Sequence, residues 1–126
     1  MPFTDTLRYS VQFGGLQVEA TYDAAGGLRP DVSEVIPPSS TDLAVAWVCD
    51  VSALSAVVLL ASAAMTVETN NASSPGNTIP LAAGQPVFWF TGCGWACPLT
   101  ADVTGLYVTS TAGGTLSIRA LVDPTP

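Results

Sequence analysis

The stretch LRYSVQFGGLQVEATY, residues 7–22, carries the most regular pattern in this 126-residue chain. Apolar and polar residues alternate along 7–13 and again along 16–22, and Gly14-Gly15 joins the two segments. Alternation with a period of two is typical of a strand with one buried face, and a two-glycine link suits a tight hairpin turn. The stretch therefore predicts a β-hairpin that covers a hydrophobic core with one face.

Further short apolar segments follow the hairpin, each bounded by turn residues. They cover residues 43–49, 56–62, 65–69, 78–81, 87–90, 105–110 and 115–122. Spacings of roughly 8–12 residues between strands are typical of sandwiches and barrels, and no stretch has capped helical periodicity. We expect one all-β domain over residues 1–126, an antiparallel β-sandwich or partly open barrel of about eight to nine short strands, jelly-roll-like.

The most apolar part of the chain, residues 43–65, is long enough to span a bilayer as a helix. Asp50 interrupts it, and Val, Ala and Ser dominate the rest. We interpret it as two buried strands joined by a corner at residues 50–54, with 43–49 apolar on both faces and therefore central in a sheet. The N-terminus has no basic and apolar leader, so no secretory signal is expected, and the net charge of −7 disfavours contact with an anionic membrane.

Two long loops, residues 23–40 and 91–101, and an extended tail, residues 123–126, are expected outside the strands. Prolines in the first loop and in the tail fix φ and remove ladder donors, which argues against central strands there. Long loops often pack against a neighbour, and extended segments can add to a partner. The candidate contact residues in these segments are Arg29, Pro30, Pro37, Pro38, Pro124 and Pro126.

The second loop contains Trp95, which lies between Gly94 and Pro98 and close to Gly92. Tryptophan is a favoured interface anchor because it offers a large rigid area at low entropic cost. One interpretation makes Trp95 the anchor of a contact loop. The alternative folds it back to plug one end of the sandwich. We interpret Trp47 and Trp89, which lie in strand segments, as core residues.

Charge excludes several classes of function. The chain has no Lys and no His, and its cations are Arg8, Arg29 and Arg119 against ten carboxylates, for a net charge of −7. Such a balance repels phosphate, so nucleic-acid binding is not expected. Without imidazole or amine side chains, the usual general base, Schiff-base chemistry and histidine-ligated zinc are all missing. We expect no enzyme, no cofactor and no metal, and a surface of low charge that meets other proteins.

The remaining reactive groups have simpler interpretations. Asp50 and Asp102 each precede a Val-Ser or Val-Thr pair and then an apolar strand, which predicts turn capping and not a catalytic carboxylate pair. Cys49 is interpreted as a small buried hydrophobe, and Cys93 and Cys97 as free thiols in the second loop. A disulfide between two of the three remains an alternative, whereas zinc lacks a fourth ligand.

Three segments of the second half resemble small structural proteins of tailed bacteriophages, head decoration or cement proteins above all. They are Leu81-Ala-Ala-Gly-Gln-Pro86, Cys97-Pro-Leu-Thr-Ala-Asp-Val-Thr-Gly-Leu-Tyr-Val-Thr109 and Thr115-Leu-Ser-Ile-Arg-Ala-Leu-Val122. The resemblance lies in short Thr/Val strands, Ala/Gly turns and low charge, and it carries over no individual functional residue.

This resemblance implies a β-sandwich or β-barrel that is made in the host cytoplasm and binds the outside of the capsid in many copies. Its expected partners are the major capsid protein and further copies of itself, as a dimer or trimer. A tail, baseplate or neck protein is one alternative. A carbohydrate-binding module is an alternative of another class, with Trp95 and Tyr107 as the aromatic platforms.

Overall fold

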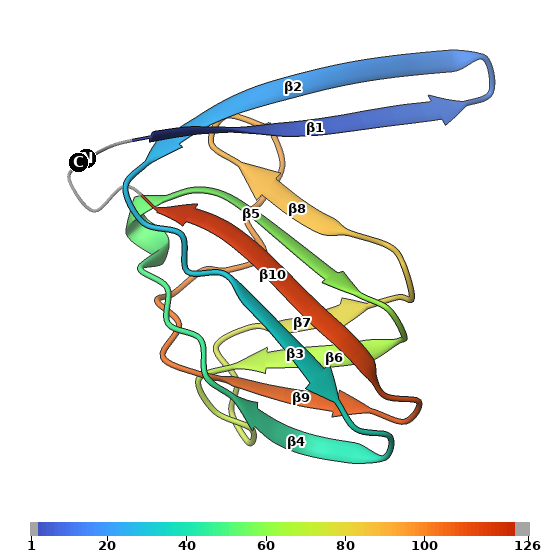
Figure 1. The fold of residues 1–126 in the computed structure, drawn as a ribbon, viewed down its shortest axis with the longest axis vertical. Helices are drawn as coiled ribbons and strands as arrows, with labels where there is room; N and C mark the ends of the chain where they lie inside the picture. Colours follow the sequence, from blue (N-terminus) through green and yellow to red (C-terminus); the bar gives the residue numbers. More distant parts are fainter. Residues whose placement is uncertain (1–2, 123–126) are drawn as a thin grey trace.

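A computed structural model describes residues 3–122, which form two four-stranded sheets and one two-stranded hairpin (Figure 1). All strand pairs are antiparallel, and neither four-stranded sheet closes into a barrel within these residues. The predicted all-β class is therefore confirmed. The strands are β1 Phe3–Phe13, β2 Leu16–Gly26, β3 Val32–Ile36, β4 Ser40–Val45, β5 Leu54–Ala61, β6 Met65–Thr69, β7 Thr78–Leu81, β8 Val87–Phe90, β9 Leu106–Ser110 and β10 Gly114–Val122.

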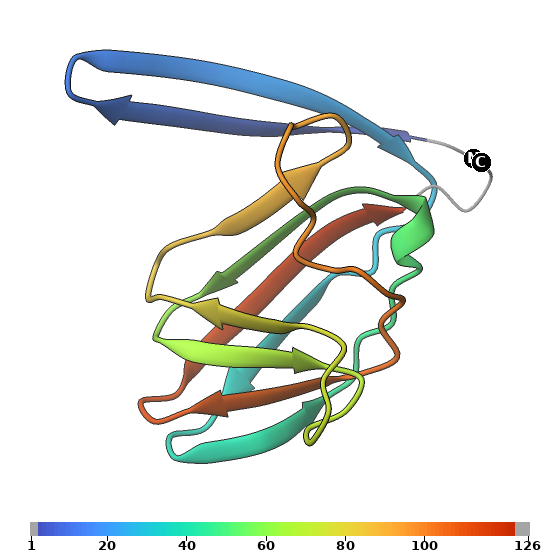
Figure 2. The same cartoon turned by 180° about the vertical axis from the view of Figure 1, so that it is seen from behind.

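The strand order is β3-β10-β5-β8 in one sheet and β4-β9-β6-β7 in the other. The first of these eight strands lies beside the last, and the second lies beside the seventh. This nesting of outer pairs around inner pairs is the order of an eight-stranded jelly roll. The chain crosses between the sheets repeatedly, so each sheet gathers strands that are distant in sequence (Figures 1 and 2).

The main core lies between the two sheets. Residues that point inward from β5, β6, β9 and β10 are almost fully buried, with Leu59, Val67, Val108 and Ile118 each at most 1% exposed. Trp47 is buried in the same core and Trp89 packs against it, as predicted. Alternation along these strands places one residue in two in the core, because successive side chains of a strand point to opposite faces.

The hairpin is the predicted one, but it is longer. Every residue of β1 pairs with one of β2, from Phe3 opposite Gly26 to Phe13 opposite Leu16. Gly14 and Gly15 have φ values of 58° and 86°, the two left-handed conformations that a two-residue turn of this hand requires. One end of the hairpin lies over the outer face of the β3-β10-β5-β8 sheet, and its turn projects beyond the sheets in both views (Figures 1 and 2). We call residues 3–26 the arm.

Two expectations about individual segments were wrong. The predicted loop 23–40 instead holds the end of β2, all of β3 and the start of β4, because its prolines flank the edge strand β3 and do not interrupt it. Residues 43–49 are not a central strand: β4 ends at Val45 and lies at a sheet edge, with Ala44, Ala46 and Val48 exposed. Alanine exposes little apolar surface and is tolerated on a solvent-facing side. A segment with apolar residues on both faces can therefore have one face uncovered.

The other predicted segments are close to the observed strands. Residues 43–65 fold into the end of β4, a 3-10 turn at Val51–Ala53, β5 and the start of β6. Within residues 3–122 there is no helix with the length and apolarity needed to cross a bilayer. Residues 91–101 form an irregular loop, as predicted, and the predicted tail 123–126 lies outside the described residues.

Candidate binding surface

The root of the arm is held by a second apolar cluster on the outer face of the β3-β10-β5-β8 sheet. Tyr22 of the arm stacks on Phe90 of β8 with ring centroids 4.6 Å apart, and Tyr9 lies 5.3 Å from Phe88. Ala24 and Leu121 are buried in the same cluster. Because offset and tilted aromatic pairs add to the gain from burial, this cluster fixes the direction of the arm.

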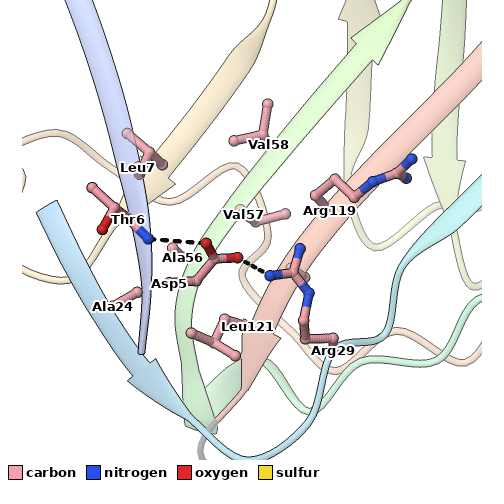
Figure 3. A pocket seen from close by; sticks show the side chains of 11 residues that line it. Asp5, Thr6, Leu7, Ala24, Arg29, Ala56, Val57, Val58, Arg119 and Leu121 are labelled. Carbon is pink, nitrogen blue, oxygen red and sulfur yellow. Dashed lines mark hydrogen bonds and ion pairs between the residues drawn. The ribbon is translucent and has the colours of Figure 1, made fainter. Parts of the chain in front are cut away.

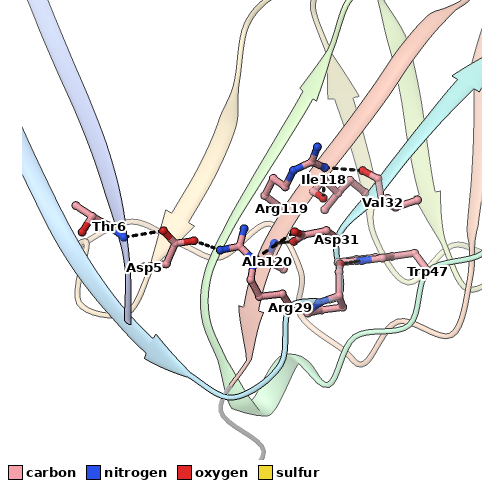
Figure 4. Close-up of polar contacts among 10 residues, drawn as sticks. Asp5, Thr6, Arg29, Asp31, Val32, Trp47, Ile118, Arg119 and Ala120 are labelled. Atoms are coloured by element: carbon pink, nitrogen blue, oxygen red, sulfur yellow. Dashed lines mark hydrogen bonds and ion pairs between the residues drawn. The ribbon is translucent and has the colours of Figure 1, made fainter. Parts of the chain in front are cut away.

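Polar contacts reinforce the root (Figure 4). Asp5 of β1 forms an ion pair with Arg29, which also bonds Asp31 at 3.2 Å. Asp31 in turn accepts the backbone N–H of Ala120 in β10 at 3.1 Å, so the network joins the arm to the sheet. Gly26, the last residue of the arm, passes close to β10. A Cβ at this position would lie 2.7 Å from the Val122 carbonyl oxygen, so only glycine fits.

A small pocket of about 150 Å³ lies between the root of the arm and the sheet (Figure 3). Its walls are mostly apolar, from Leu7, Ala56, Val57 and neighbouring residues, and the ion pair of Asp5 and Arg29 lies at its side. The carboxylate and the guanidinium already satisfy one another, so we assign this pocket to the packing of the arm.

Trp95 is turned back under the arm. Its indole Nε1 donates a hydrogen bond to the Phe88 carbonyl oxygen at 2.9 Å, and its ring lies nearly perpendicular to those of Tyr9, Phe88 and Phe90. Trp89 donates to the Trp95 carbonyl oxygen at 3.1 Å, which holds the loop in place. The residue is still 43% exposed. Trp95 is therefore folded back, but onto the outer face of the sheet and not into one end of the sandwich, and its exposed part leaves contact with a partner as a prediction.

Among residues 3–122, nothing packs beneath the outer half of the arm. Four apolar side chains there are strongly exposed, namely Val11 at 50%, Phe13 at 85%, Leu16 at 60% and Val18 at 41%. We call these four residues the arm tip. They lie on the same face as Tyr9 and Tyr22, because strand pairing sets Val11 opposite Val18 and Phe13 opposite Leu16. With side-chain areas of order 150–200 Å², they leave roughly 400 Å² of apolar surface uncovered.

A second exposed apolar site, which we call the groove, lies beside the root of the arm. It has a volume of about 370 Å³ and is lined by Leu28, Arg29, Pro30, Val48, Cys49, Asp50 and Val122. Leu28 is 56% exposed and Val48 is 68% exposed. A hydrogen bond from the Trp47 indole to the Pro30 carbonyl oxygen fixes one wall. The groove contains Arg29 and Pro30, two of the predicted contact residues.

The other predicted contact residues lie apart from both sites. Pro37 and Pro38 form the exposed turn between β3 and β4, where the Ser40 hydroxyl donates to the Pro37 carbonyl oxygen at 2.6 Å. Pro124 and Pro126 lie outside the described residues. The structure thus brings together Arg29 and Pro30 but neither of them with Trp95. The arm tip was not among the predicted contacts.

The two aspartate corners prove to be neighbours. Cys49 and Val103 exchange backbone hydrogen bonds at 2.9 and 3.0 Å, which sets Asp50 beside Asp102. Asp50 caps the 3-10 turn by accepting the Ser52 N–H at 3.1 Å, as predicted. Asp102 instead accepts the N–H of Val51 in the other corner, at 3.0 Å. Both carboxylates therefore accept hydrogen bonds from backbone N–H groups of the corner at residues 50–54.

The three cysteines are free thiols. Cys49 is buried, and burial, with the nearby carboxylates of Asp50 and Asp102, raises the pKa of its thiol to about 11. Burial also raises the pKa of Cys97. Across residues 3–122, no cluster of three or more His, Cys, Asp or Glu side chains is arranged to hold a metal ion. The described surface offers apolar contact area at the arm tip and in the groove.

Comparison with known proteins adds no relative to this description: no family model, curated protein or solved structure matches the chain.

Proposed function

We propose that this chain is a structural virion protein, a head decoration or cement protein of a tailed bacteriophage that binds the outer surface of the capsid. The observation that carries the proposal is the projecting arm, whose tip leaves four large apolar side chains in solvent. A contiguous exposed apolar patch of a few hundred Å² marks a contact surface for another protein. The aromatic cluster and the ion pair at the root fix the direction of the arm, so the tip is held at a defined position in solvent.

The charge pattern supports attachment to protein. Only 10% of residues are charged, against about 25% in an ordinary domain. A weakly charged surface lies against a neighbouring subunit at low desolvation cost, because few ions must lose water. The acidic balance disfavours contact with the packaged nucleic acid, which suits a position on the outside of a shell.

The fold is compatible with this role and does not by itself assign it. Eight-stranded jelly rolls occur in viral capsid proteins and also in lectins. Function must therefore be argued from the surface. Here the sugar-binding alternative has weaker support, because the indole of Trp95 is occupied by an internal hydrogen bond and three aromatic neighbours.

The test is the location of the chain in purified particles. We expect mass spectrometry to find it at a copy number comparable with that of the major capsid protein. A much smaller number per particle would favour the tail, baseplate or neck alternative.

Particles stripped of the protein should rupture at a lower temperature, and adding back the purified chain should restore their heat stability. Absence from particles, or unchanged rupture after stripping, would refute decoration. Specific binding on a glycan array would favour the carbohydrate-binding alternative.

A further inference from the structure

We infer that the arm tip of one molecule binds in the groove of a second copy of the same chain, so that copies associate tip to root. The inference deepens the proposed function by naming the partner of the arm, and it rests on that function only for where the assembly would lie. Tip and groove are separate surfaces of one molecule, each is mostly apolar, and no other part of residues 3–122 covers either of them.

The arm tip cannot be covered by its own sandwich. The eleven-residue pairing of β1 with β2 and the stacking of Tyr22 on Phe90 fix the arm as a straight ribbon over the end of the sheet. From Tyr9 to Phe13 the strand advances by about 13 Å, at roughly 3.3 Å per residue, past the aromatic cluster that supports Tyr9. The apolar face of the hairpin therefore continues beyond the surface on which it packs.

The groove fits an apolar side chain of this kind. A cavity of about 150 Å³ lined by apolar side chains is large enough to bind benzene. The groove, at about 370 Å³, has room for the phenyl ring of Phe13 with part of a neighbouring tip residue. Leu28 and Val48 at its rim are exposed by more than half, so an inserted ring would bury apolar surface on both sides.

Charge also favours a second copy. Two molecules with a net charge of −7 repel each other, so their contact must avoid unpaired carboxylates. Residues 9–18 of the arm contain no charged side chain. In the groove, Arg29 is paired with Asp5 and Asp31, and Asp50 is bound to Ser52 as the cap of the 3-10 turn. An apolar tip therefore meets a groove whose charges are already partnered.

The geometry makes the contact directional. The β2–β3 connection, which carries Leu28 and Pro30, lies at the root of the arm, and the hairpin turn lies at the opposite end in both views (Figures 1 and 2). A contact between different surfaces of identical molecules closes into a ring or continues as a chain. Roughly 400 Å² from the tip is below the 800 Å² or so per partner of a stable interface. Each contact is therefore weak alone and is strengthened by ring closure or by a lattice.

The test is sedimentation velocity of the purified full chain over a wide concentration range, with no other protein present. We expect the average mass of the wild type to rise with concentration. Two variants at exposed positions, Phe13→Ser in the tip and Val48→Asp in the groove, should each lower the association constant at least about tenfold. Val35→Ser is the matched control, because Val35 is 73% exposed and belongs to neither surface, and it should associate like the wild type.

Mixing the two variants gives the decisive result. The tip variant keeps an intact groove and the groove variant keeps an intact tip, so an equimolar mixture can form one contact per pair. We expect a two-copy species in the mixture and none larger, whereas each variant alone at the same concentration associates at least about tenfold more weakly than the wild type.

Three outcomes would overturn the inference. Loss of association in the tip variant alone, with the groove variant unaffected, would mean that tips pair with each other. A wild type that stays monomeric at every concentration would give the arm a different partner. A chain ending at Val122 that associates when the full chain does not would assign the groove to residues 123–126. None of these outcomes concerns the heat stability of particles, so the proposed function is tested by a separate experiment.

Discussion

Replacing Trp95 with alanine separates a structural role of this residue from a role in partner binding. The indole donates a hydrogen bond to Phe88 and meets three aromatic rings edge-on, with centroids 5.6 to 6.3 Å apart. At 43% exposure, a little over half of its surface is buried. The substitution removes those contacts and leaves the Phe88 carbonyl to water.

The expected cost follows from these contacts. Truncation withdraws on the order of 100 Å² of buried apolar surface, worth about 2.5 kcal/mol at 25 cal/mol per Å². The edge-on aromatic contacts and the hydrogen bond add to this loss, and relaxation of the partly exposed loop into the vacated space recovers part of it. We expect Trp95→Ala to lower the free energy of unfolding by about 2–4 kcal/mol, with a fall in melting temperature on the order of 10 °C.

The assay is urea unfolding followed by far-ultraviolet circular dichroism, because the substitution itself changes tryptophan fluorescence. Phe13→Ala is the matched control: it removes another large ring, 85% exposed, and should change the free energy of unfolding by less than about 0.5 kcal/mol. A change of similar small size for Trp95→Ala, together with lost binding to particles, would refute the packing argument and make Trp95 a partner anchor.

Three further predictions concern sites away from the arm tip. Gly113→Ala should lower the free energy of unfolding by at least about 2 kcal/mol, because φ is 74° and a Cβ would lie 2.6 Å from the backbone nitrogen of Pro38 in the β3–β4 turn. Gly14→Ala is the control: φ is also positive but the space around it is open, so the same unfolding assay should show a loss of only about 1–2 kcal/mol. Cys49 should resist alkylation at neutral pH until the chain unfolds, since its pKa of about 11 keeps the thiol protonated; peptide mapping that finds it modified in the native protein would contradict this. Loss of hydration and the neighbouring Asp42 raise the pKa of Glu68, so the native state holds the proton of this carboxyl group more tightly than the unfolded chain does. The difference in free energy of unfolding between the wild type and Glu68→Gln should therefore fall as pH rises from about 4.5. A difference that stays flat or rises with pH would contradict this.

Local pattern was sufficient for much of the fold. Alternation along residues 7–22 and the Gly14-Gly15 link determined the hairpin and its register, because side-chain period and turn type depend only on neighbouring residues. The strands from β5 onward and the turn capped by Asp50 were found for the same reason. The absence of His and Lys, likewise a property of the sequence alone, limited the chemistry of every site.

The tertiary structure decided how far each apolar face is covered. Periodicity shows that a face is apolar, but the extent of the surface beneath it depends on residues distant in sequence. The same alternation therefore packs Tyr9 and Tyr22 on β8 and leaves Phe13 and Leu16 in solvent. Residues 43–45 likewise end an edge strand, although the segment 43–49 is apolar on both faces. The sequence pattern indicated seven residues in each strand of the hairpin, whereas the folded strands have eleven, about twice the usual strand length. The other strands have 4 to 9 residues, so the sheet does not extend beneath the whole hairpin.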